Sequence, residues 1–313
     1  MKNYFIINPN AGRKRRKAKL LSRIERAASE TGLDCEVYFT RSMSDGEAFA
    51  RKMCSDNPDE VFRFFGCGGD GTLNEVINGI YGFDNAVAGN VPLGTGNDFA
   101  RAFGPLKSFA DIKAQLLGNI REVDLIRCTY ELDGQHIVRY CDNMINIGFD
   151  SNVVAKAAEI RKGGVVTGSA AYLLGVGIIL IKKKGADLRI ELDNGYVHDG
   201  PLLLTAAANG RYCGGGVQSS PQSLVDDGMI EVSVIKEVSR TKFISLYPSY
   251  SKGTHIDNLT AEGILDYHRV RSLKITSNTG SMKVSNDGEI ISPHALELEV
   301  VPKAIKFSVP AGI

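Results

Sequence analysis

The sequence VFRFFGCGGDGT at residues 61–72 contains the strongest indication of the fold of this chain. Val61 to Phe65 is an apolar run of strand length that ends in a series of glycines. Thr72 and Glu75 have the spacing of a capping box, which marks the start of a helix. The apolar face of that helix would consist of Leu73, Val76, Ile77 and Ile80. The stretch therefore predicts a buried strand, a glycine-rich turn and a helix in succession, the repeating unit of an α/β sheet.

The same alternation of strand and helix continues on both sides of this stretch. The other expected strands are residues 4–7, 35–40 and 86–93. Helical spacing follows them from Leu20 to Ala28, from a second capping box at Ser44 and Glu47 through Cys54, and from Asn97 to about Phe103. Alternating strands and helices predict a doubly wound parallel sheet with helices on both sides.

The pattern changes after about residue 120. Short strand-like segments now follow one another, separated by turn residues such as Asp133-Gly134 and Asn194-Gly195. The expected strands are residues 122–132, 137–147, 187–192, 202–208, 229–235, 270–276, 282–285 and 296–301. This succession predicts a second domain, an antiparallel β-sandwich-like one, that begins near residues 125–135.

The composition excludes several classes of protein. The 313 residues are 43% hydrophobic and 23% charged, which is typical of a globular protein and not of a disordered or fibrous chain. With 37 basic and 36 acidic residues the net charge is +1, so the basic excess of a dedicated nucleic-acid binder is missing and we expect no nucleic-acid partner. The six cysteines form no Cys-x-x-Cys pair, and no apolar leader opens the sequence, so we expect no zinc site and a cytoplasmic location.

One segment challenges that location. Gly163 to Ile181 carries no charged residue, but its strongly apolar part, from Ala170 to Ile181, is too short to span a bilayer and is typical of a buried core helix. Two alternatives stay open for this segment: a membrane span, and a helix at the membrane interface or lining a lipid pocket.

The loop from Gly68 to Thr72 has the features of a phosphate-binding turn. Glycines let the backbone approach a ligand closely. The amino end of the following helix offers free N–H groups and a partial positive charge. An aspartate in such a loop would repel a bare phosphate, so we expect Asp70 to order a metal ion or its water shell. The alternative is a tight turn in which Asp70 accepts local hydrogen bonds.

Two other turns between strand and helix share this character. They are Asn8-Pro9-Asn10-Ala11-Gly12 and the sequence LGTGNDFAR at residues 93–101. In the second, Asn97 or Asp98 as a helix cap and Arg101 as a surface ion pair would be an alternative, but it leaves the glycines unexplained. The carboxyl ends of parallel strands meet at one edge of the sheet, where ligands bind. Three such turns therefore predict a nucleotide crevice.

These motifs resemble those of the diacylglycerol kinase catalytic domain family, which includes bacterial soluble diacylglycerol kinases, related bacterial lipid kinases and sphingosine kinases. The resemblance starts with residues 68–72 and 93–101 and spans nearly the whole chain. It continues in NMINIGFD at 143–150, NGRYCGGG at 209–216, DDGM at 226–229 and DGE at 287–289. NAD kinases and phosphofructokinases have similar Gly-Gly-Asp-Gly loops, so the combination with the later motifs is the specific feature.

The resemblance implies an ATP- and Mg²⁺-dependent kinase that phosphorylates a lipid hydroxyl. It implies an α/β nucleotide domain at residues 1–128, joined by a return segment at about 303–313, and a β-rich lipid-substrate domain at 129–302. It also implies nucleotide contacts from Asn8, Pro9, Asn10, Ala11, Gly12, Thr40, Gly66, Cys67, Gly68, Gly69, Asp70, Gly71, Thr72, Thr95 and Asn97.

The resemblance further assigns charged residues to the chemistry. Glu289 would be the general base on the lipid hydroxyl, with Asp287 and Asp70 as further catalytic residues. An acidic network around the catalytic Mg²⁺ would contain Asp70, Asp98, Asp124 and Asp287 together with Arg101, and Arg13 stands where some members have a lysine. A second, structural Mg²⁺ would bind Asp227 and the carbonyl groups of Leu224 and Met229.

General chemistry agrees with these roles. Phosphoryl transfer requires positioning and charge neutralisation more than covalent help. Carboxylates hold Mg²⁺ well through retained waters, and a carboxylate can accept the proton of a hydroxyl. Taken alone, Asp287-Gly288-Glu289 reads as a solvated hairpin turn and Asp227-Gly228 as a plain turn, so both alternatives remain open at this point.

The expected partners are ATP and a lipid at the inner face of the membrane, with diacylglycerol as the first candidate and phosphatidic acid as its product. A homodimer through the β-rich domain would fit the resemblance. The alternatives are a kinase of a sphingoid base, phosphatidylglycerol or undecaprenol, a soluble-substrate kinase like NAD kinase, and a non-catalytic regulator that binds nucleotide or lipid. The motif at 93–101 argues against the soluble kinase, and the intact acids argue against the regulator.

Overall fold

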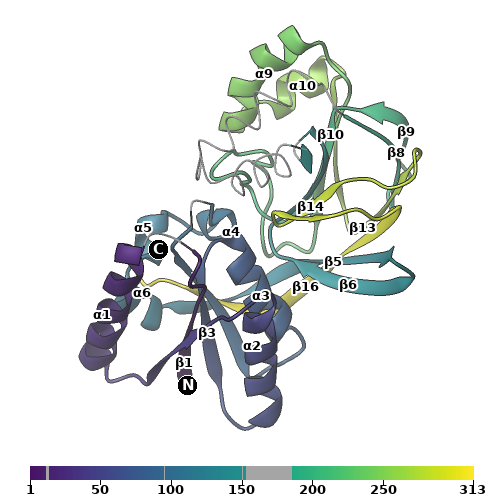
Figure 1. The fold of residues 1–313 in the computed structure, drawn as a ribbon. Coiled ribbons are helices and arrows are strands. Elements are labelled where there is room, and N and C mark those ends of the chain that lie inside the picture. The colour runs from purple at the N-terminus through teal and green to yellow at the C-terminus, as the bar shows by residue number, and fades with distance from the viewer. Residues whose placement is uncertain (12–13, 95, 150, 153–184) are drawn as a thin grey trace. The chain divides into compact units, whose positions relative to one another are not determined.

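The computed structural model describes residues 1–11, 14–94, 96–149, 151–152 and 185–313 (Figure 1). The chain divides into two compact units: a first unit of residues 1–124 and 302–313, and a second unit of residues 125–301. The two boundaries fall inside long strands, β5 (Asn119–Leu132) and β16 (Ala295–Val309). The uncharged segment 163–181 lies outside the described residues. None of the helices in the described ranges is long and apolar enough to cross a bilayer.

The first unit contains a parallel sheet with the strand order β2-β1-β3-β4-β16. The new strands are β1 (Lys2–Ile7), β2 (Cys35–Phe39), β3 (Phe62–Gly68) and β4 (Ala86–Pro92). The helices are α1 (Lys14–Thr31), α2 (Asp45–Asp56), α3 (Asp70–Ile80), α4 (Asp98–Arg101), α5 (Leu106–Phe109) and α6 (Ile112–Leu116). In Figure 1, α2 and α3 cover one face of the sheet and α1 and α6 the other. The doubly wound parallel sheet is confirmed.

The central position of β3 explains its continuous apolar sequence. Phe62, Phe64 and Phe65 are fully buried, because helices cover both faces of the strand. On one face Phe64 stacks on Tyr4, with ring centroids 5.7 Å apart. On the other face Phe65 stacks on Phe5 at 4.8 Å. The glycines that follow are thereby held at a fixed place at the end of a rigid strand.

The two predicted capping boxes are wrong. Helix α3 begins at Asp70 with Gly69 as its cap, so Thr72 lies inside the helix, and Ser44 makes no side-chain cap. Instead, the carboxylate of Glu75 accepts the backbone N–H groups of Ser44 and Gly46, both at 3.1 Å, and so caps the neighbouring helix α2. Burial raises the pKa of Glu75, and these two N–H groups oppose the rise. The spacing of Thr72 and Glu75 predicted a cap within one helix. Glu75 instead reaches the neighbouring helix because α2 and α3 pack side by side.

The second unit is a sandwich of two sheets, as predicted. Within this unit one sheet has the order β6-β5-β16-β13-β8-β9, and the other has the order β12-β11-β10-β7-β14-β15. The first sheet adds β6 (Gln135–Cys141), β8 (Ala186–Leu192), β9 (Val197–Leu202) and β13 (Ser272–Ser277). The second contains β7 (Met144–Gly148), β10 (Leu204–Ala208), β11 (Ile230–Ile235), β12 (Leu265–Val270), β14 (Val284–Asn286) and β15 (Glu289–Ile291). Helices α9 (Arg240–Lys252) and α10 (Ile256–Ala261) belong to the same unit.

Three of the expected strands include residues of two strands that belong to different sheets. The run 137–147 is divided between β6 and β7, and the chain changes sheets at Asp142 and Asn143. The run 202–208 is divided at Leu203, between β9 and β10, and the run 270–276 at Arg271, between β12 and β13. Both sheets face the same core, so apolar residues lie on each side of every break. At Leu203 the break is itself apolar and hydropathy does not reveal it, whereas polar residues mark the breaks at Asp142-Asn143 and at Arg271.

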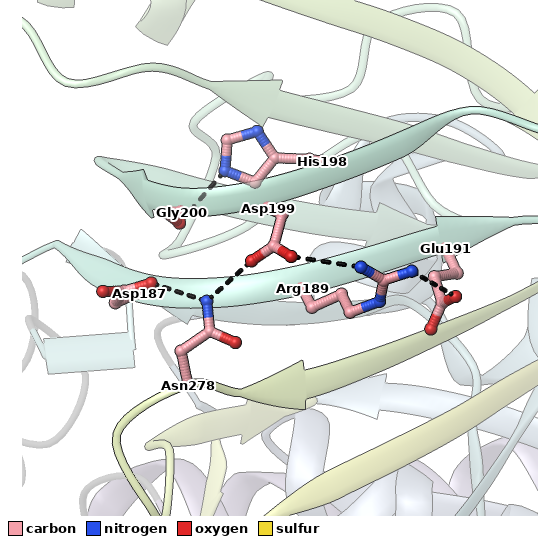
Figure 2. Close-up of polar contacts among 7 residues, drawn as sticks. All are labelled: Asp187, Arg189, Glu191, His198, Asp199, Gly200 and Asn278. Atoms are coloured by element: carbon pink, nitrogen blue, oxygen red, sulfur yellow. Dashed lines mark hydrogen bonds and ion pairs between the residues drawn. The ribbon is translucent and has the colours of Figure 1, made fainter.

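The charged side chains on β8 and β9 compensate one another. Figure 2 shows Arg189 between Glu191 and Asp199, at 3.0 and 3.1 Å. It also shows the amide of Asn278 donating to Asp187 and Asp199. Strand β9 is an edge of its sheet, and charged edge strands discourage pairing with other chains. These acids are therefore accounted for by local pairing.

Candidate active site

Three turns between strand and helix meet at the carboxyl edge of the sheet in the first unit. The N–H of Asn8, after β1, donates to the carbonyl of Cys67 at 3.3 Å. The N–H groups of Leu93 and Gly94, after β4, both donate to the carbonyl of Gly68 at 2.9 Å. Thr40, after β2, donates to the carbonyl of Ile7 at 3.0 Å. The turns that the sequence analysis assigned to the nucleotide are therefore adjacent in the fold.

Glycine is required where two of these turns approach each other. A Cβ on Gly94 would lie 2.8 Å from the Cα of Gly69, closer than real Cβ atoms approach backbone. A Cβ on Gly68 would lie 2.1 Å from the hydroxyl of Thr72. A Cβ on Gly71, by contrast, would meet no described atom within 4 Å. Gly68 and Gly94 are required because the chain packs closely at these positions. Gly71 instead faces open space at the amino end of α3, where a phosphate can bind N–H groups.

The carboxylate of Asp70 holds the turn that follows β4. Its Oδ2 accepts the N–H of Asn97 at 2.8 Å, and its Oδ1 accepts the N–H of Asp98 at 2.6 Å. Asn97 has a left-handed φ of 59°. Consecutive N–H groups around a left-handed residue form a concave anion site, here filled by a carboxylate. Asp70 is thus a hydrogen-bond acceptor, as expected if the loop were only a tight turn. However, these hydrogen bonds join its own turn to the turn that follows β4.

A second carboxylate lies beside Asp70. The Cβ position that Gly96 leaves empty is 2.2 Å from Oδ2 of Asp70 and 3.7 Å from Oδ2 of Asp98. Asp98 is only 4% exposed, and the Nε of Arg101 lies 3.3 Å from its Oδ1. Asp70 and Asp98 are thus two carboxylates close to one another beside Gly96, and such a pair can share a divalent cation. In the part of the chain that the structure describes, no three His, Cys, Asp or Glu side chains converge as metal ligands, so Mg²⁺ would take its other ligands from water and phosphate.

The other residues expected at this site have diverse positions. Asp124 is fully buried, and its Oδ1 accepts the N–H of Lys303 at 2.7 Å, so it anchors the returning part of β16. Cys67 is fully buried at the end of β3, and burial raises the pKa of its thiol, which leaves it a poor nucleophile. Gly12, Arg13 and Thr95 lie outside the described residues.

The later motifs gather at one end of a sheet in the second unit. Met144 at the start of β7 is opposite Ala208 at the end of β10, and Ile145 is opposite Asn286 at the end of β14. The carbonyl of Asn143 accepts the N–H groups of Asn209 and Gly210, both at 2.9 Å. The segments that begin at residues 143, 209 and 287 are therefore neighbours.

Asp287 fastens these segments together. Asp287 and Gly288 have φ values of 45° and 88° and form the hairpin turn between β14 and β15 that the sequence predicted. The carboxylate does not point to solvent alone, because four donors of the segment before β7 reach it. They are the N–H of Asp142 at 2.9 Å, the N–H of Asn143 at 3.2 Å, the N–H of Met144 at 2.9 Å and the thiol of Cys141 at 3.1 Å.

Glu289 lies on the other side of the same hairpin. It is exposed at the start of β15, opposite Asn286. Burial raises the pKa of Tyr130 on β5, and the negative charge of Glu289 contributes to the rise. An exposed carboxylate on a short, fixed hairpin has the freedom to meet a hydroxyl of a substrate.

Asp227 is already paired with a cation of the protein. Its Oδ1 accepts the N–H of Met229 at 3.1 Å, and Nη2 of Arg269 lies 2.5 Å from its Oδ2. The Nε of Arg269 also lies 2.8 Å from Glu231, which is 2% exposed. A divalent cation would share the carboxylate with a guanidinium, so these residues, with the exposed Leu224, fit the expected second Mg²⁺ poorly.

The sequence analysis did not identify three charged residues at this end of the sheet. Asp142 is 1% exposed and directly precedes the motif that begins at Asn143. Glu231 and Arg269 are opposite each other across β11 and β12. Only the register of these strands reveals that pair, whereas an acid beside Asn143 could have been noticed from the sequence.

An apolar pocket lies between α9, α10 and the strands β10 and β11 of the second unit. Its interior is about 20 Å³. The lining residues are Phe149, Leu203, Leu204, Ile235, Val238, Phe243, Leu246, Tyr247, Tyr250 and Leu259. A cavity of this size has room for about one water molecule, so an acyl chain would enter only if these elements moved apart.

Comparison with known proteins agrees with both units. Residues 2–128 match the model of the diacylglycerol kinase catalytic domain, and residues 143–309 match that of the YegS C-terminal NAD kinase beta sandwich-like domain. A Pseudomonas aeruginosa protein named "Probable lipid kinase YegS-like" is 34% identical over 247 residues, 78% of this chain and 76% of that protein. A diacylglycerol kinase of Bacillus subtilis is 27% identical over 91% of this chain and 88% of its own length. A solved diacylglycerol kinase structure from Bacillus anthracis has the same fold, with a TM-score of 0.71 at 20% identity over 99% of this chain and 97% of that one.

Proposed function

The chain belongs to the diacylglycerol kinase catalytic domain family, and from that premise we propose that it is a lipid kinase that transfers the γ-phosphate of ATP to a lipid hydroxyl. Diacylglycerol is the first candidate acceptor, with phosphatidic acid as the product. The observation that carries the proposal is the arrangement around Asp70. The carboxylates of Asp70 and Asp98 both lie close to Gly96, next to the open amino end of α3.

On the nucleotide side, the N–H groups at the start of α3 would bind phosphate oxygens beside Gly71. Asp70 and Asp98 would hold Mg²⁺, which neutralises charge on the transferring phosphoryl group. Arg101 balances the charge of Asp98, at 3.3 Å. The close approach of Gly69 and Gly94 keeps the two turns in register, so the site is assembled before the nucleotide arrives.

On the acceptor side, Glu289 would accept the proton of the lipid hydroxyl. The hydroxyl oxygen forms a bond to the γ-phosphorus as the bond from that phosphorus to the bridging oxygen of ADP breaks. The products are the phosphorylated lipid, ADP and a proton on Glu289, which returns to water. Exposure suits this role, because Glu289 must reach a substrate and then release its proton.

Two classes of alternative remain to be separated from this proposal. A different lipid alcohol, such as a sphingoid base, phosphatidylglycerol or undecaprenol, would use the same chemistry. A soluble acceptor such as NAD would not require apolar contacts, and the motif at residues 93–101 argues against it. A non-catalytic regulator would bind nucleotide without turnover.

The test is transfer of labelled γ-phosphate from Mg-ATP to a panel of acceptors in mixed micelles. The panel contains diacylglycerol, monoacylglycerol, ceramide, a sphingoid base, phosphatidylglycerol and undecaprenol, with NAD as the soluble acceptor. We expect labelled phosphatidic acid. A label on another lipid would change the acceptor and keep the reaction class, whereas a label on NAD alone would replace the proposal with a soluble kinase. Tight ATP binding with no transfer to any acceptor would favour the regulator.

A further inference from the structure

The second unit contains two Asp-Gly turns with nearly the same backbone. Asp133-Gly134 has φ values of 51° and 74°, and Asp287-Gly288 has 45° and 88°. Each closes a two-residue hairpin, between β5 and β6 in the first case and between β14 and β15 in the second. Since left-handed turns favour Asp and Gly for conformational reasons, the turn alone explains the residue types at both places.

The carboxylates of the two turns differ completely in surroundings. Asp133 is exposed at the tip of its hairpin. The carboxylate of Asp287 instead accepts three backbone N–H groups, from Asp142 to Met144, and the thiol of Cys141. The turn does not require these bonds, so the carboxylate of Asp287 has a role beyond closing the hairpin.

The distribution of donors argues against a metal ion at Asp287. Its Oδ1 receives three of the donors, the N–H groups of Asn143 and Met144 and the thiol of Cys141. A carboxylate oxygen offers about two lone pairs, so this oxygen is saturated. The donors also carry partial positive charge, which disfavours a cation beside this oxygen. Asp70, by contrast, accepts one backbone N–H group on each oxygen.

The bonds of Asp287 continue into a second segment. Asn143 accepts the N–H groups of Asn209 and Gly210, and its amide donates to the carbonyl of Tyr212 at 2.8 Å. The amide of Asn209 donates to the carbonyl of Asp142, also at 2.8 Å. Gly210 is held so closely that a Cβ on it would lie 2.0 Å from Oδ1 of Asn143. The turn at 287, the segment 141–144 and the segment 209–212 therefore form one hydrogen-bonded assembly.

We propose that Asp287 is a positioning residue that fastens the segments 141–144 and 209–212 to the hairpin bearing Glu289, and that it is not a ligand of Mg²⁺. Glu289 is two residues away on that hairpin, so a shift of the hairpin moves the carboxylate that meets the lipid hydroxyl. The part of the inference that concerns turnover rests on the proposed function. The hydrogen-bonded assembly and its independence from Mg²⁺ do not.

The experiment compares Asp287→Asn with Asp133→Asn, which changes the same residue type in the same kind of turn. Hydrogen exchange of residues 141–144 is measured without nucleotide, with EDTA and with Mg²⁺, and turnover is measured against Mg²⁺ concentration. In Asp287→Asn we expect exchange at 142–144 to accelerate at least tenfold, because the new amide group faces N–H donors. We expect kcat to fall about 10²-fold through misplacement, with the half-saturating Mg²⁺ concentration within twofold of the wild type. Asp133→Asn should leave all three quantities unchanged.

A second variant keeps the test decisive if Asp287→Asn does not fold. Gly210→Ala disturbs the same assembly from its far side and leaves Asp287 intact, so it should also accelerate exchange and lower kcat with unchanged Mg²⁺ dependence. A tenfold or larger rise in half-saturating Mg²⁺ in Asp287→Asn would overturn the proposal, as would wild-type exchange at 142–144 in that variant. Protection of 142–144 in the wild type only when Mg²⁺ is present would overturn it too. If turnover is absent even in the wild type, the proposed function fails while the exchange results still decide the role of Asp287.

Discussion

The carboxylates of Asp70 in the first unit and Asp287 in the second make the same kind of hydrogen bond to backbone N–H groups. Their proposed roles in the reaction differ. Each carboxylate accepts successive N–H groups of another motif, Asn97 and Asp98 in one case and Asp142 to Met144 in the other. The segment that Asp70 holds brings a second carboxylate, that of Asp98, close to Asp70 beside Gly96. The N–H and thiol donors that Asp287 holds saturate one of its oxygens. An aspartate in a family motif can therefore either contribute to a cation site or fix the positions of neighbouring segments. Only its surroundings distinguish the two roles.

The largest expected effect is that of Asp70→Asn. Loss of a carboxylate from the proposed cation site should lower turnover by about 10³-fold, since a bound metal ion contributes several kcal/mol of charge stabilisation. The half-saturating Mg²⁺ concentration should rise, in contrast to Asp287→Asn. The measurement is a Mg²⁺ titration of phosphate transfer for both variants.

A matched control for Asp70→Asn is Asp111→Asn. Asp111 also lies in the first unit and caps a helix, accepting the N–H of Ala114 at 3.2 Å. This variant should retain turnover and Mg²⁺ dependence. An Asp70→Asn protein with wild-type Mg²⁺ dependence would show that Asp70 only fixes geometry, and the contrast with Asp287 would disappear.

The next effect concerns the glycines that let Asp70 reach its partners. In Gly94→Ala the new methyl group would lie 2.8 Å from the Cα of Gly69, so the two turns must separate. We expect a loss of about 2 kcal/mol in the free energy of unfolding and weaker ATP binding. Gly71→Ala is the counterpart, because its methyl group would meet no described atom. It should keep wild-type stability and weaken only ATP binding. Urea unfolding and calorimetric ATP titration measure both, and equal stability losses would contradict the packing argument.

The smallest expected effect is on the alkylation of two buried thiols, Cys67 in the first unit and Cys141 in the second. Burial raises the pKa of Cys67 and of Cys141 well above the usual range, and the negative charges of Asp287 and Asp142 raise that of Cys141 further. A raised pKa leaves little thiolate at pH 8, so both should resist alkylation in the folded protein. Asp287→Asn should expose Cys141 to reagent and leave Cys67 protected. Mass spectrometry of the alkylated peptides measures the labelling of each thiol. Equal labelling of both thiols in Asp287→Asn would mean that the variant is destabilised throughout, which would contradict a local role of Asp287.

The sequence predicted the architecture because its strongest signals are local and repeated. The strand at 61–65 with its glycine turn, and the alternation around it, were sufficient for the parallel sheet of the first unit. Where a prediction depended on which elements pack together, it was wrong. Glu75 has the correct spacing to cap its own helix and caps α2 instead, because α2 lies beside it. The change of sheet at Leu203 was hidden by an apolar run that continues from β9 into β10.

Site residues were identified by type more reliably than by role. The sequence singled out Asp70, Asp98, Arg101 and Asp287, and the structure gives hydrogen-bond or ion-pair partners to each. Their partners come from segments that are distant in sequence, as in the bond between Asp287 and Asp142, 145 positions apart. No local pattern encodes such a pairing. For the same reason the ion pair of Glu231 and Arg269 beside Asp227 was not foreseen.

Proton removal from the acceptor is tested by phosphate transfer to diacylglycerol in the wild type and in Glu289→Gln, with ATP affinity measured on the same samples. If Glu289 is the base on the acceptor, its amide cannot take the proton, and turnover should fall by about 10²- to 10⁴-fold. ATP should bind both proteins equally, because Glu289 lies outside the nucleotide turns. Equal turnover in the two proteins would contradict the account, since the proton would then have to leave by another route.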